Sequence, residues 1–261
     1  MDLGLEGRLA VVTGASKGIG LAVTRTLVRE GVRVVAGART RSADLDALVS
    51  AGTVLPVEVD LSTPDGPATL VAAALELGSV DLLVNNVGAV TPRVDGFLAV
   101  TDDEWAATIN LSLMAAVRAT RAVLPSMLDA GGGSVVTISS VNAFLPDPDV
   151  IDYGAAKAAL TNFSKALSKQ VGPRGVRLNT ISPGPVATDL WLGEHGVAAT
   201  VGLAAGSDPA AVSAAAAGQS VTGRFTRPQE IAELVAFLAS DVAANVTGAD
   251  FVIDGGLTTQ T

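Results

Sequence analysis

Tyr153 and Lys157 are the two side chains of this sequence best suited to acid–base chemistry, and Ser140 precedes Tyr153 by thirteen residues. Residues four positions apart on a helix lie on one face, with Cβ atoms about 5–6 Å apart. A lysine ammonium at that distance biases a phenol toward its ionised, proton-accepting form. The spacing therefore predicts an acid–base device carried by one helix.

The glycine-rich segment from Gly14 to Gly20 is the second feature that points to a function. The apolar run at residues 8–13 enters it and an amphipathic stretch from Ile19 to Glu30 leaves it, which is typical of the strand–turn–helix start of a βαβ unit. Glycines allow the backbone to approach a pyrophosphate, and the helix N-terminus favours negative charge. The spacing is Gly-x-x-x-Gly-x-Gly rather than the commoner Gly-x-Gly-x-x-Gly.

Short apolar runs alternate with helical patterns along most of the chain. Strands are predicted at residues 8–13, 32–37, 53–59, 80–85, 134–139, 176–181 and 251–253, and helices at 18–30, 67–77, 102–128, 153–171 and 228–239. Thr101 and Glu104 form a capping-box pattern before the helix at 102–128. The alternation predicts one doubly wound α/β domain with a parallel sheet over residues 1–261. Ligands of such sheets bind where the strand order reverses, so segments 14–20 and 85–88 should face each other.

Composition excludes several classes of site. The 261 residues contain no cysteine, which excludes disulfides, thiolate nucleophiles and cysteine-based zinc sites. The single histidine, His195, excludes multi-histidine metal clusters and is expected to be a solvated surface side chain. The formal charge of −9 disfavours nucleic-acid or anionic membrane surfaces as partners. Uninterrupted apolar runs stay well below the ~18 residues of a membrane span, so we expect a soluble, cytoplasmic protein.

A series of motifs, taken in chain order, resembles the short-chain dehydrogenase/reductase family. The motifs are Thr13-Gly14-x-x-x-Gly18-Ile19-Gly20, Asn85-Asn86-Val87-Gly88, Asn110, Ser140, Tyr153-x-x-x-Lys157, and Asn179 with Pro183-Gly184. One departure is Val87, which stands where the family usually has alanine, and only local repacking is expected from it. The resemblance implies a Rossmann-type doubly wound sheet of seven parallel strands. It also implies an oxidoreductase that interconverts a ketone and a secondary alcohol by hydride transfer.

The resemblance assigns a role to each polar residue of the series. Tyr153 would be the general acid or base, Ser140 would hold the substrate oxygen, and Lys157 would bind the nicotinamide ribose and favour tyrosinate. Asn110 would anchor a water that connects Lys157 to solvent. Because a phenol titrates near ~10, Tyr153 needs nearby positive charge to act as a base around neutrality. The implied cofactor-binding residues are Gly14, Ser16, Lys17, Gly18, Ile19, Gly20, Arg39, Asp60, Leu61, Asn86, Val87, Gly88, Tyr153, Lys157, Pro183, Gly184, Val186 and Thr188. The implied substrate contacts are Ser140, Asn142, Tyr153 and Trp191, and no metal is implied.

The end of the second predicted strand favours NADP(H) over NAD(H). Relatives that use NAD(H) place an acid there, which binds the adenosine ribose hydroxyls and repels a 2′-phosphate. Here the position is Ala38, followed by Arg39, whose guanidinium can bind phosphate through paired hydrogen bonds. Lys17 can reach the same phosphate. Asp60, after the third strand, stands where the family places a carboxylate against the adenine, and its alternative role is to cap a turn.

The segment from residue 185 to 224 breaks the alternation and contains Trp191, His195 and several glycines. In the family this region covers the substrate, and long irregular segments are often functional lids. The sequence Ala210-Ala211-Val212-Ser213-Ala214 favours a helical surface excursion, and the two interpretations are compatible.

Charge around the predicted site bears on the substrate. Many relatives reduce 3-oxoacyl groups on an acidic carrier protein, which would require basic residues at the pocket mouth. Residues 127–134 contain none, and Asp147, Asp149 and Asp152 are predicted to crowd the approach to Tyr153, with Arg174 as the main exception. We therefore predict a small, uncharged or weakly polar ketone or alcohol, with 3-oxoacyl-carrier-protein reduction as the alternative.

Two further functional classes stay open at this stage. Residues 14–18 also match the Gly-x-Ser-x-Gly nucleophile elbow of a serine hydrolase, in which Ser16 would act with an aspartate and His195. That elbow normally follows several strands, whereas here it follows the first. A non-catalytic dinucleotide sensor is the other class, but such proteins typically lack the tyrosine or the lysine.

The resemblance also implies assembly through the helices at 102–128 and 153–171 and the C-terminal strand. From it we predict a homotetramer with closed symmetry.

Overall fold

Seven parallel strands form the centre of the fold in the computed structural model, which describes residues 2–50 and 52–259. The strands are β1 (Leu9–Thr13), β2 (Arg33–Ala38), β3 (Val54–Glu58), β4 (Leu82–Asn85), β5 (Gly133–Ile138), β6 (Val176–Pro183) and β7 (Asp250–Ile253). Their order in the sheet is β3-β2-β1-β4-β5-β6-β7, and neighbouring strands pair in parallel. The predicted doubly wound seven-stranded sheet is confirmed.

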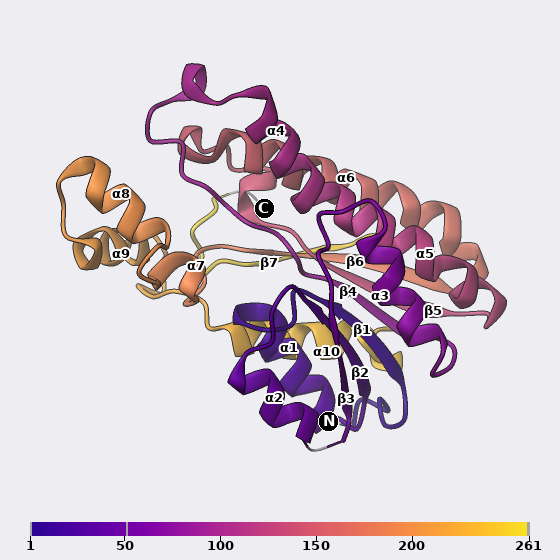
Figure 1. Cartoon of the computed structure of the whole chain (residues 1–261). Helices are drawn as coiled ribbons and strands as arrows, with labels where there is room; N and C mark the ends of the chain where they lie inside the picture. Colours follow the sequence, from indigo (N-terminus) through magenta and orange to yellow (C-terminus); the bar gives the residue numbers. More distant parts are fainter. Residues whose placement is uncertain (1, 51, 260–261) are drawn as a thin grey trace.

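Helices cover both faces of this sheet. They are α1 (Gly18–Arg29), α2 (Ala43–Ser50), α3 (Gly66–Leu75), α4 (Asp102–Ile109), α5 (Ala115–Asp129), α6 (Ile151–Val171), α7 (Asp189–Leu192), α8 (Val197–Ala205), α9 (Pro209–Gly218) and α10 (Pro228–Ala239). Short 3₁₀ turns lie at η1 (Phe97–Ala99), η3 (Val141–Ala143), η4 (Pro148–Val150), η5 (Gly172–Arg174) and η6 (Asp241–Ala243). Helices α1, α2 and α10 lie on one face, and α3, α5 and α6 lie on the other (Figure 1).

The core has two layers because side chains alternate along each strand. On β1, Val12 packs into the cluster that includes Leu27 of α1 and Ile231 of α10. Its neighbour Val11 packs into the opposite cluster, which includes Met127 of α5. Burial on both faces explains why the strands read as continuous apolar runs rather than as alternating ones.

The strand order reverses between β1 and β4, so the loops after these two strands border one crevice. The side-chain amide of Asn86 crosses it and donates to the backbone oxygens of Thr13 at 2.9 Å and Gly14 at 3.2 Å. The predicted meeting of segments 14–20 and 85–88 is therefore confirmed.

Two helical regions before segment 185–224 differ from the sequence prediction. Helix α2 was not predicted, because Leu45 is its only fully buried residue and so it carries no clear helical period. The helix predicted at 102–128 is interrupted by a π-helical turn, η2 (Asn110–Met114). The predicted capping box is confirmed: Thr101 Oγ1 accepts from Glu104 N at 3.3 Å, and the Glu104 carboxylate accepts from Thr101 N at 2.8 Å.

The segment 185–224 is helical rather than irregular, since it forms α7, α8 and α9. Its two ends meet, because Val186 pairs with Thr226 in an isolated bridge and Ala187 N donates to Thr226 O at 2.9 Å. Helices α8 and α9 pack on each other and project from the body of the molecule (Figure 1).

One helical stretch of the described chain, Asp102–Asp129, is long and apolar enough to cross a membrane by length and composition alone. The sequence prediction counted uninterrupted apolar residues and therefore did not find it. The stretch packs against α3, α6, β4 and β5, and a core helix gives the same composition. The absence of membrane association stays a prediction.

Candidate active site

A cavity of about 1140 Å³ opens at the carboxyl ends of β1, β4, β5 and β6. The predicted site residues converge on it from distant parts of the sequence. Those that line it are Gly14, Ser16, Lys17, Gly18, Ile19, Arg39, Asp60, Leu61, Asn86, Val87, Gly88, Asn110, Ser140, Asn142, Tyr153, Lys157, Pro183, Gly184, Val186, Thr188 and Trp191. Gly20 lies behind the lining, where a Cβ would be 2.2 Å from the carbonyl oxygen of Gly14.

The glycine-rich turn takes a shape that side chains would oppose. Gly14 and Gly18 have φ angles of +67° and +55°, in the left-handed region that glycine enters without steric cost. The Lys17 side chain does not cap α1, so the first N–H groups of that helix stay available at the cavity. Val87 packs against this turn, its Cα lying 3.2 Å from the position of a Cβ on Gly14. The turn is shaped to accept an anion at the start of α1.

Two exposed cations lie near Ala38, the position at which the sequence analysis expects an acid in NAD(H)-dependent relatives. Ala38 ends β2 and is buried, while Arg39 and Lys17 are exposed at the cavity. Neither cation forms an ion pair with a residue that the structure describes. Arg41 also lines the cavity, but it is held by Asp46, with Nε 2.6 Å from Oδ1. Arg39 and Lys17 are therefore the cations available at this end for a further negative group.

Asp60 caps the turn after β3. Its carboxylate accepts from the hydroxyl of Ser62 at 2.7 Å and from the backbone N–H of Ser62 at 2.9 Å. These bonds hold the pKa of Asp60 below its usual value, and the charge of Arg39 acts in the same direction. The turn-capping role is present, and the side chain still lines the cavity.

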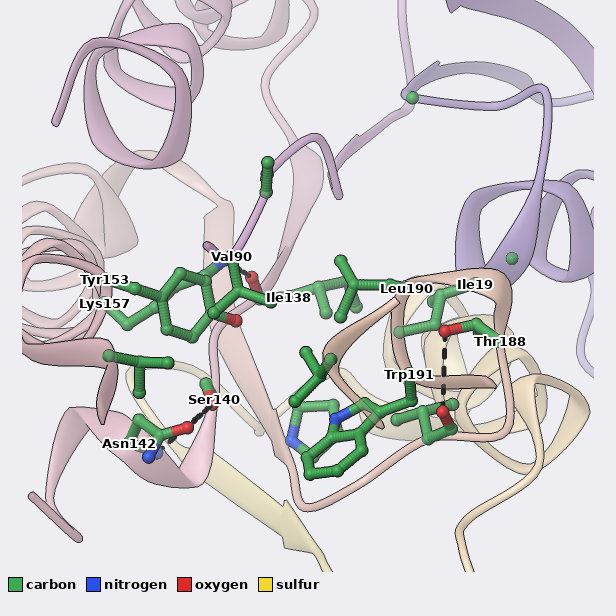
Figure 2. A pocket seen from close by; sticks show the side chains of 18 of the residues that line it. Ile19, Val90, Ile138, Ser140, Asn142, Tyr153, Lys157, Thr188, Leu190 and Trp191 are labelled. Atoms are coloured by element: carbon green, nitrogen blue, oxygen red, sulfur yellow. Dashed lines mark hydrogen bonds between the residues drawn. The ribbon is translucent and has the colours of Figure 1, made fainter. Parts of the chain in front are cut away.

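Tyr153 and Lys157 lie on one face of α6, as their spacing predicted (Figure 2). The Lys157 Nζ atom is 5.6 Å from the centre of the Tyr153 ring. It donates to the carbonyl oxygen of Ile138, at the end of β5, at 2.8 Å. The ammonium is thus buried and anchored to the sheet beside the phenol.

Burial dominates the titration of this pair. It raises the pKa of Tyr153, with the Ser140 hydroxyl acting in the opposite direction. It lowers the pKa of Lys157 to about 8. The expected bias toward tyrosinate is therefore not seen, because removal from water disfavours the charged form of each group. At neutral pH Tyr153 is a neutral phenol.

Ser140 lies at the cavity after β5, where it opens the turn η3. Its hydroxyl donates to the side-chain oxygen of Asn142 at 3.2 Å and accepts from the backbone N–H of Asn142 at 3.2 Å. The preceding residue, Ser139, is 2.6 Å from the hydroxyl of Thr161 on α6. Strand β5 and helix α6 are thereby linked where Ser140 and Tyr153 approach each other across the cavity (Figure 2).

Sequence comparison finds similarity along nearly the whole chain. Residues 14–258 match the family model described as enoyl-(acyl carrier protein) reductase. The 3-oxoacyl-acyl-carrier-protein reductase FabG of Pseudomonas aeruginosa is 35% identical over 263 residues, which cover 98% of this chain and 99% of that protein. The chain belongs to the short-chain dehydrogenase/reductase family.

Solved structures of family members are similar as well. L-sorbose reductase from Gluconobacter frateurii, complexed with NADPH and L-sorbose, has a TM-score of 0.92 and 32% identity, with 100% of both chains covered. The aldohexose dehydrogenase of Thermoplasma acidophilum has a TM-score of 0.87 and 27% identity, covering 100% of this chain and 98% of its own.

Asn110 departs from the contact that the family resemblance implies. It begins the π-helical turn, and its amide donates to the carbonyl oxygen of Ser62 while its oxygen accepts from Arg118 at 2.7 Å. The side chain therefore joins α5 to the loop that holds Asp60, rather than pointing to Lys157. A water relay from Asn110 to Lys157 stays a prediction. Sequence spacing could not show this, because it does not fix the direction of a side chain at a π-helical turn.

Ser112 was not predicted as a site residue. It is buried on the same turn and, with Lys157, borders Gly88: a Cβ there would lie 3.5 Å from Lys157 Nζ and 3.8 Å from Ser112 Oγ. Neither Ser112 nor Asn179 lines the cavity itself, and the Asn179 side chain binds Val246 O and Ala249 N. It holds β6 to the segment before β7.

Asp152 does not lie where the sequence analysis placed it. Asp147 and Asp149 line the cavity as predicted, whereas Asp152 is buried and paired with Arg93. It contributes no open negative charge to the approach to Tyr153. The prediction failed because Arg93 is 59 residues away in sequence.

Trp191 reaches the cavity from α7, opposite Ser140 and Asn142 (Figure 2). Its ring meets that of Phe225 edge-on, with centroids 5.2 Å apart and an interplanar angle of 69°. Small aliphatic residues of α8 and α9, including Val201 and Ala215, complete this wall.

His195 does not line the cavity, although Ser16 does. No group of three or more acidic or histidine side chains that could hold a metal ion occurs among the described residues.

Proposed function

We propose that this chain is an NADP(H)-dependent oxidoreductase that interconverts a ketone and a secondary alcohol. The observation that carries the proposal is the convergence of Ser140, Tyr153 and Lys157 on a cavity that also contains the glycine-rich turn. Membership of the family supports an enzyme acting between CH–OH and C=O.

The end of the cavity that contains the glycine-rich turn, Arg39 and Arg41, here called the nucleotide end, fits NADP(H). The turn at Gly14 and Gly18 leaves the backbone open at the N-terminus of α1, which suits a pyrophosphate. Arg39 and Lys17 suit a 2′-phosphate, and Ala38 leaves no acid to repel it. The structure of L-sorbose reductase with NADPH supports the same choice. When bound, NADP(H) supplies or accepts the hydride at C4 of its nicotinamide.

The protein supplies the proton transfer at oxygen. In the reductive direction the neutral phenol of Tyr153 donates its proton to the carbonyl oxygen, and the Ser140 hydroxyl turns from Asn142 to donate a hydrogen bond to the same oxygen. The Lys157 ammonium, held against Ile138 O, stabilises the phenolate that remains. Because burial keeps Tyr153 protonated at neutral pH, the phenol can act directly as the general acid in reduction, whereas it must first lose its proton to act as the base in oxidation.

The opposite end of the cavity, lined by Ser140–Val150 and by α7 to α9, is here called the substrate end. Its charge supports a small, uncharged or weakly polar ketone as the substrate. The cations in the lining are Lys157 and three residues of the nucleotide end, Lys17, Arg39 and Arg41. The lining from Ser140 to Val150 and from α7 to α9 has no basic side chain, and it includes the carboxylates of Asp147 and Asp149. An anionic substrate would approach these carboxylates without a counter-charge, which is unfavourable.

Reduction of 3-oxoacyl groups on a carrier protein is the second candidate function. Its support is the name of several bacterial relatives that are 32–35% identical over 97–98% of this chain. Arg174, exposed beside the end of α5, is the basic residue that would favour a carrier protein.

The two candidates are distinguished by steady-state kinetics with NADPH and NADH. Uncharged ketones, anionic ketones, a 3-oxoacyl carrier protein and an enoyl thioester are compared as substrates. We expect the highest kcat/KM for an uncharged ketone with NADPH. A higher value for the acyl carrier protein would establish the second candidate. NADPH binding without turnover of any carbonyl compound would indicate a sensor, and ester hydrolysis that depends on Ser16 and His195 would indicate a hydrolase.

A further inference from the structure

A buried arginine outside the cavity lining, Arg93, joins the segments that form the substrate end. Its side chain is 8% exposed and contacts Asp152, whose side chain is 2% exposed, through both Nη2 and Nε. Its Nη1 atom donates to Glu104 Oε1 at 2.7 Å. The hydroxyl of Thr108 donates at 2.7 Å to Asp152 Oδ2, which also accepts from Arg93 Nη2. Every charged group of this cluster thus has a partner.

The cluster joins two neighbouring segments of the chain, Arg93 and α4, to helix α6, which is far from both in the sequence. Arg93 follows the β4 loop, Glu104 and Thr108 lie on α4, and Asp152 is in the first turn of α6, directly before Tyr153. The backbone N–H of Arg93 also donates to the carbonyl oxygen of Asp149 at 2.6 Å. Arg93 therefore holds segment 147–152 through its backbone and through its side chain.

The residues next to this cluster form the cavity wall. Val90 and Pro92 line the cavity just before Arg93, and Asp149 and Val150 line it just before Asp152. Figure 2 shows Val90 on the side of the pocket where Tyr153 lies. Arg93 is absent from the lining, so we expect no direct contact between it and a bound substrate. Any effect that it has on turnover must pass through these neighbours.

Stability alone is a weak reason for such a pair. Taking two charges out of water costs several kcal/mol, roughly what their attraction returns, and apolar side chains of similar volume often stabilise a core equally well. What a paired arginine and carboxylate add is a fixed relative orientation. Burial by itself would raise the pKa of Asp152, but the hydrogen bonds from Arg93 and Thr108 and the charge of Arg93 lower it, so the pair is ionised at neutral pH.

We propose that Arg93 is a positioning residue for ketone reduction. It sets the separation of segment 90–93, Asp149 and the first turn of α6, and so it fixes Tyr153 relative to the substrate oxygen while leaving the nucleotide end unaffected. This inference rests on the proposed function.

The first test compares Arg93→Met with a matched control, Arg177→Met. Arg177 is also a partly buried arginine, donating to the carbonyl oxygens of Leu238 at 2.8 Å and Ser240 at 3.1 Å, and it does not line the cavity. Both variants should lose thermal stability. Only Arg93→Met should lower kcat/KM for the ketone, by about 10- to 100-fold, because small misplacements of reacting groups have effects of that size. The NADPH dissociation constant, measured by fluorescence titration, should stay unchanged in both.

Two further variants separate positioning from stability. Arg93→Lys keeps the charge but loses the double contact, so its kcat/KM should lie between those of the wild type and Arg93→Met. Arg93→Met alone leaves the buried Asp152 carboxylate without its arginine. The double variant Arg93→Met with Asp152→Asn removes that charge, so it should regain thermal stability without regaining kcat/KM. A purely structural role for Arg93 predicts that both quantities return together.

A measurement that needs no substrate completes the design. In Arg93→Met, backbone amides of residues 90–96 and 147–153 should exchange with solvent deuterium faster than in Arg177→Met, with residues 14–20 unchanged. Normal ketone turnover in folded Arg93→Met, or equal loss of NADPH affinity, would overturn the inference. If the wild type reduces no ketone, the proposed function is contradicted and not the role of Arg93. The hydrogen–deuterium exchange of residues 90–96 and 147–153 then decides whether Arg93 holds these segments. If Arg93→Met does not fold, Arg93→Lys carries the same comparisons.

Discussion

The hydroxyl of Tyr153 is the group on which the proposed proton transfer depends. Tyr153→Phe keeps the ring and its packing on α6 but removes the acid. We expect turnover to fall by at least ~100-fold, the usual scale of general acid–base catalysis. Ketone reduction by the variant, with NADPH binding measured alongside, checks this. Near-normal turnover in a folded variant that binds NADPH would show that another group donates the proton.

Lys157 should leave a signature in the pH dependence of stability. Its pKa of about 8 in the fold lies below the ordinary 10.5, so the fold disfavours its proton. Below pH 8 this effect lowers the free energy of unfolding by its full amount, about 3 kcal/mol. The loss of stability disappears as the pH rises toward 10.5. The raised pKa of Tyr153 acts only above 10, outside this window.

Relative to Lys157→Met, the wild type should therefore become more stable between pH 8 and pH 10. Urea unfolding of both proteins without ligand, at matched ionic strength, measures the difference. Parallel stability curves for the two proteins would mean that Lys157 titrates normally.

The choice between the two dinucleotides is also set by single residues. Ala38→Asp with Arg39→Leu restores the acid and removes one cation, so kcat/KM should come to favour NADH. Each lost charge-assisted contact should cost ~1.5–3 kcal/mol of NADPH binding. Arg41→Leu is the control, because Arg41 lines the same end but is paired with Asp46. A wild type with higher kcat/KM for NADH than for NADPH contradicts the assignment.

At the scale of elements, one wall of the cavity is supported by the contact between Trp191 of α7 and Phe225, which directly follows segment 185–224. Phe225→Ala removes the edge-on partner of Trp191, a contact worth about 0.5–1.5 kcal/mol beyond its buried area. We expect a higher KM for the ketone with kcat largely retained, since Tyr153 and Lys157 are untouched. Leu203→Ala is the control, because Leu203 is 86% exposed on α8 and does not line the cavity. Equal effects of the two substitutions would exclude a specific role for Phe225.

Local patterns explain which elements could be predicted from the sequence. The helical spacing of Tyr153 and Lys157 and the glycines of the first turn depend on neighbours in sequence, and both were placed correctly. The ion pair of Arg93 with Asp152 joins residues 59 apart, and no local pattern encodes it. The orientation of Asn110 depends on a π-helical turn, which has no periodic signature.

At the scale of the whole molecule, we predict a homotetramer. Ala155 and Ala159 are exposed on α6 and would permit close approach of a second helix, whereas Ala156 is buried within this chain. Light scattering at micromolar concentration should give four times the chain mass. Ala155→Arg with Ala159→Arg should lower that mass, while exposed Ala211→Arg on α9 should not. A monomer mass for the wild type contradicts the prediction.

The bridge between Val186 and Thr226 has a consequence for how such a protein can change over evolutionary time. Because the chain leaves β6 just before Val186 and comes back beside it at Thr226, just before α10, the intervening residues form a cassette with adjacent ends. The entropy cost of closing a loop grows only slowly with loop length, so insertions or deletions within the cassette change this cost little. They also impose no shift on the strands. Substrate preference can therefore diversify while the nucleotide end is inherited unchanged, and exchange of residues 189–225 between relatives, which leaves Thr188 beside the glycine-rich turn in place, is the natural unit for redesign.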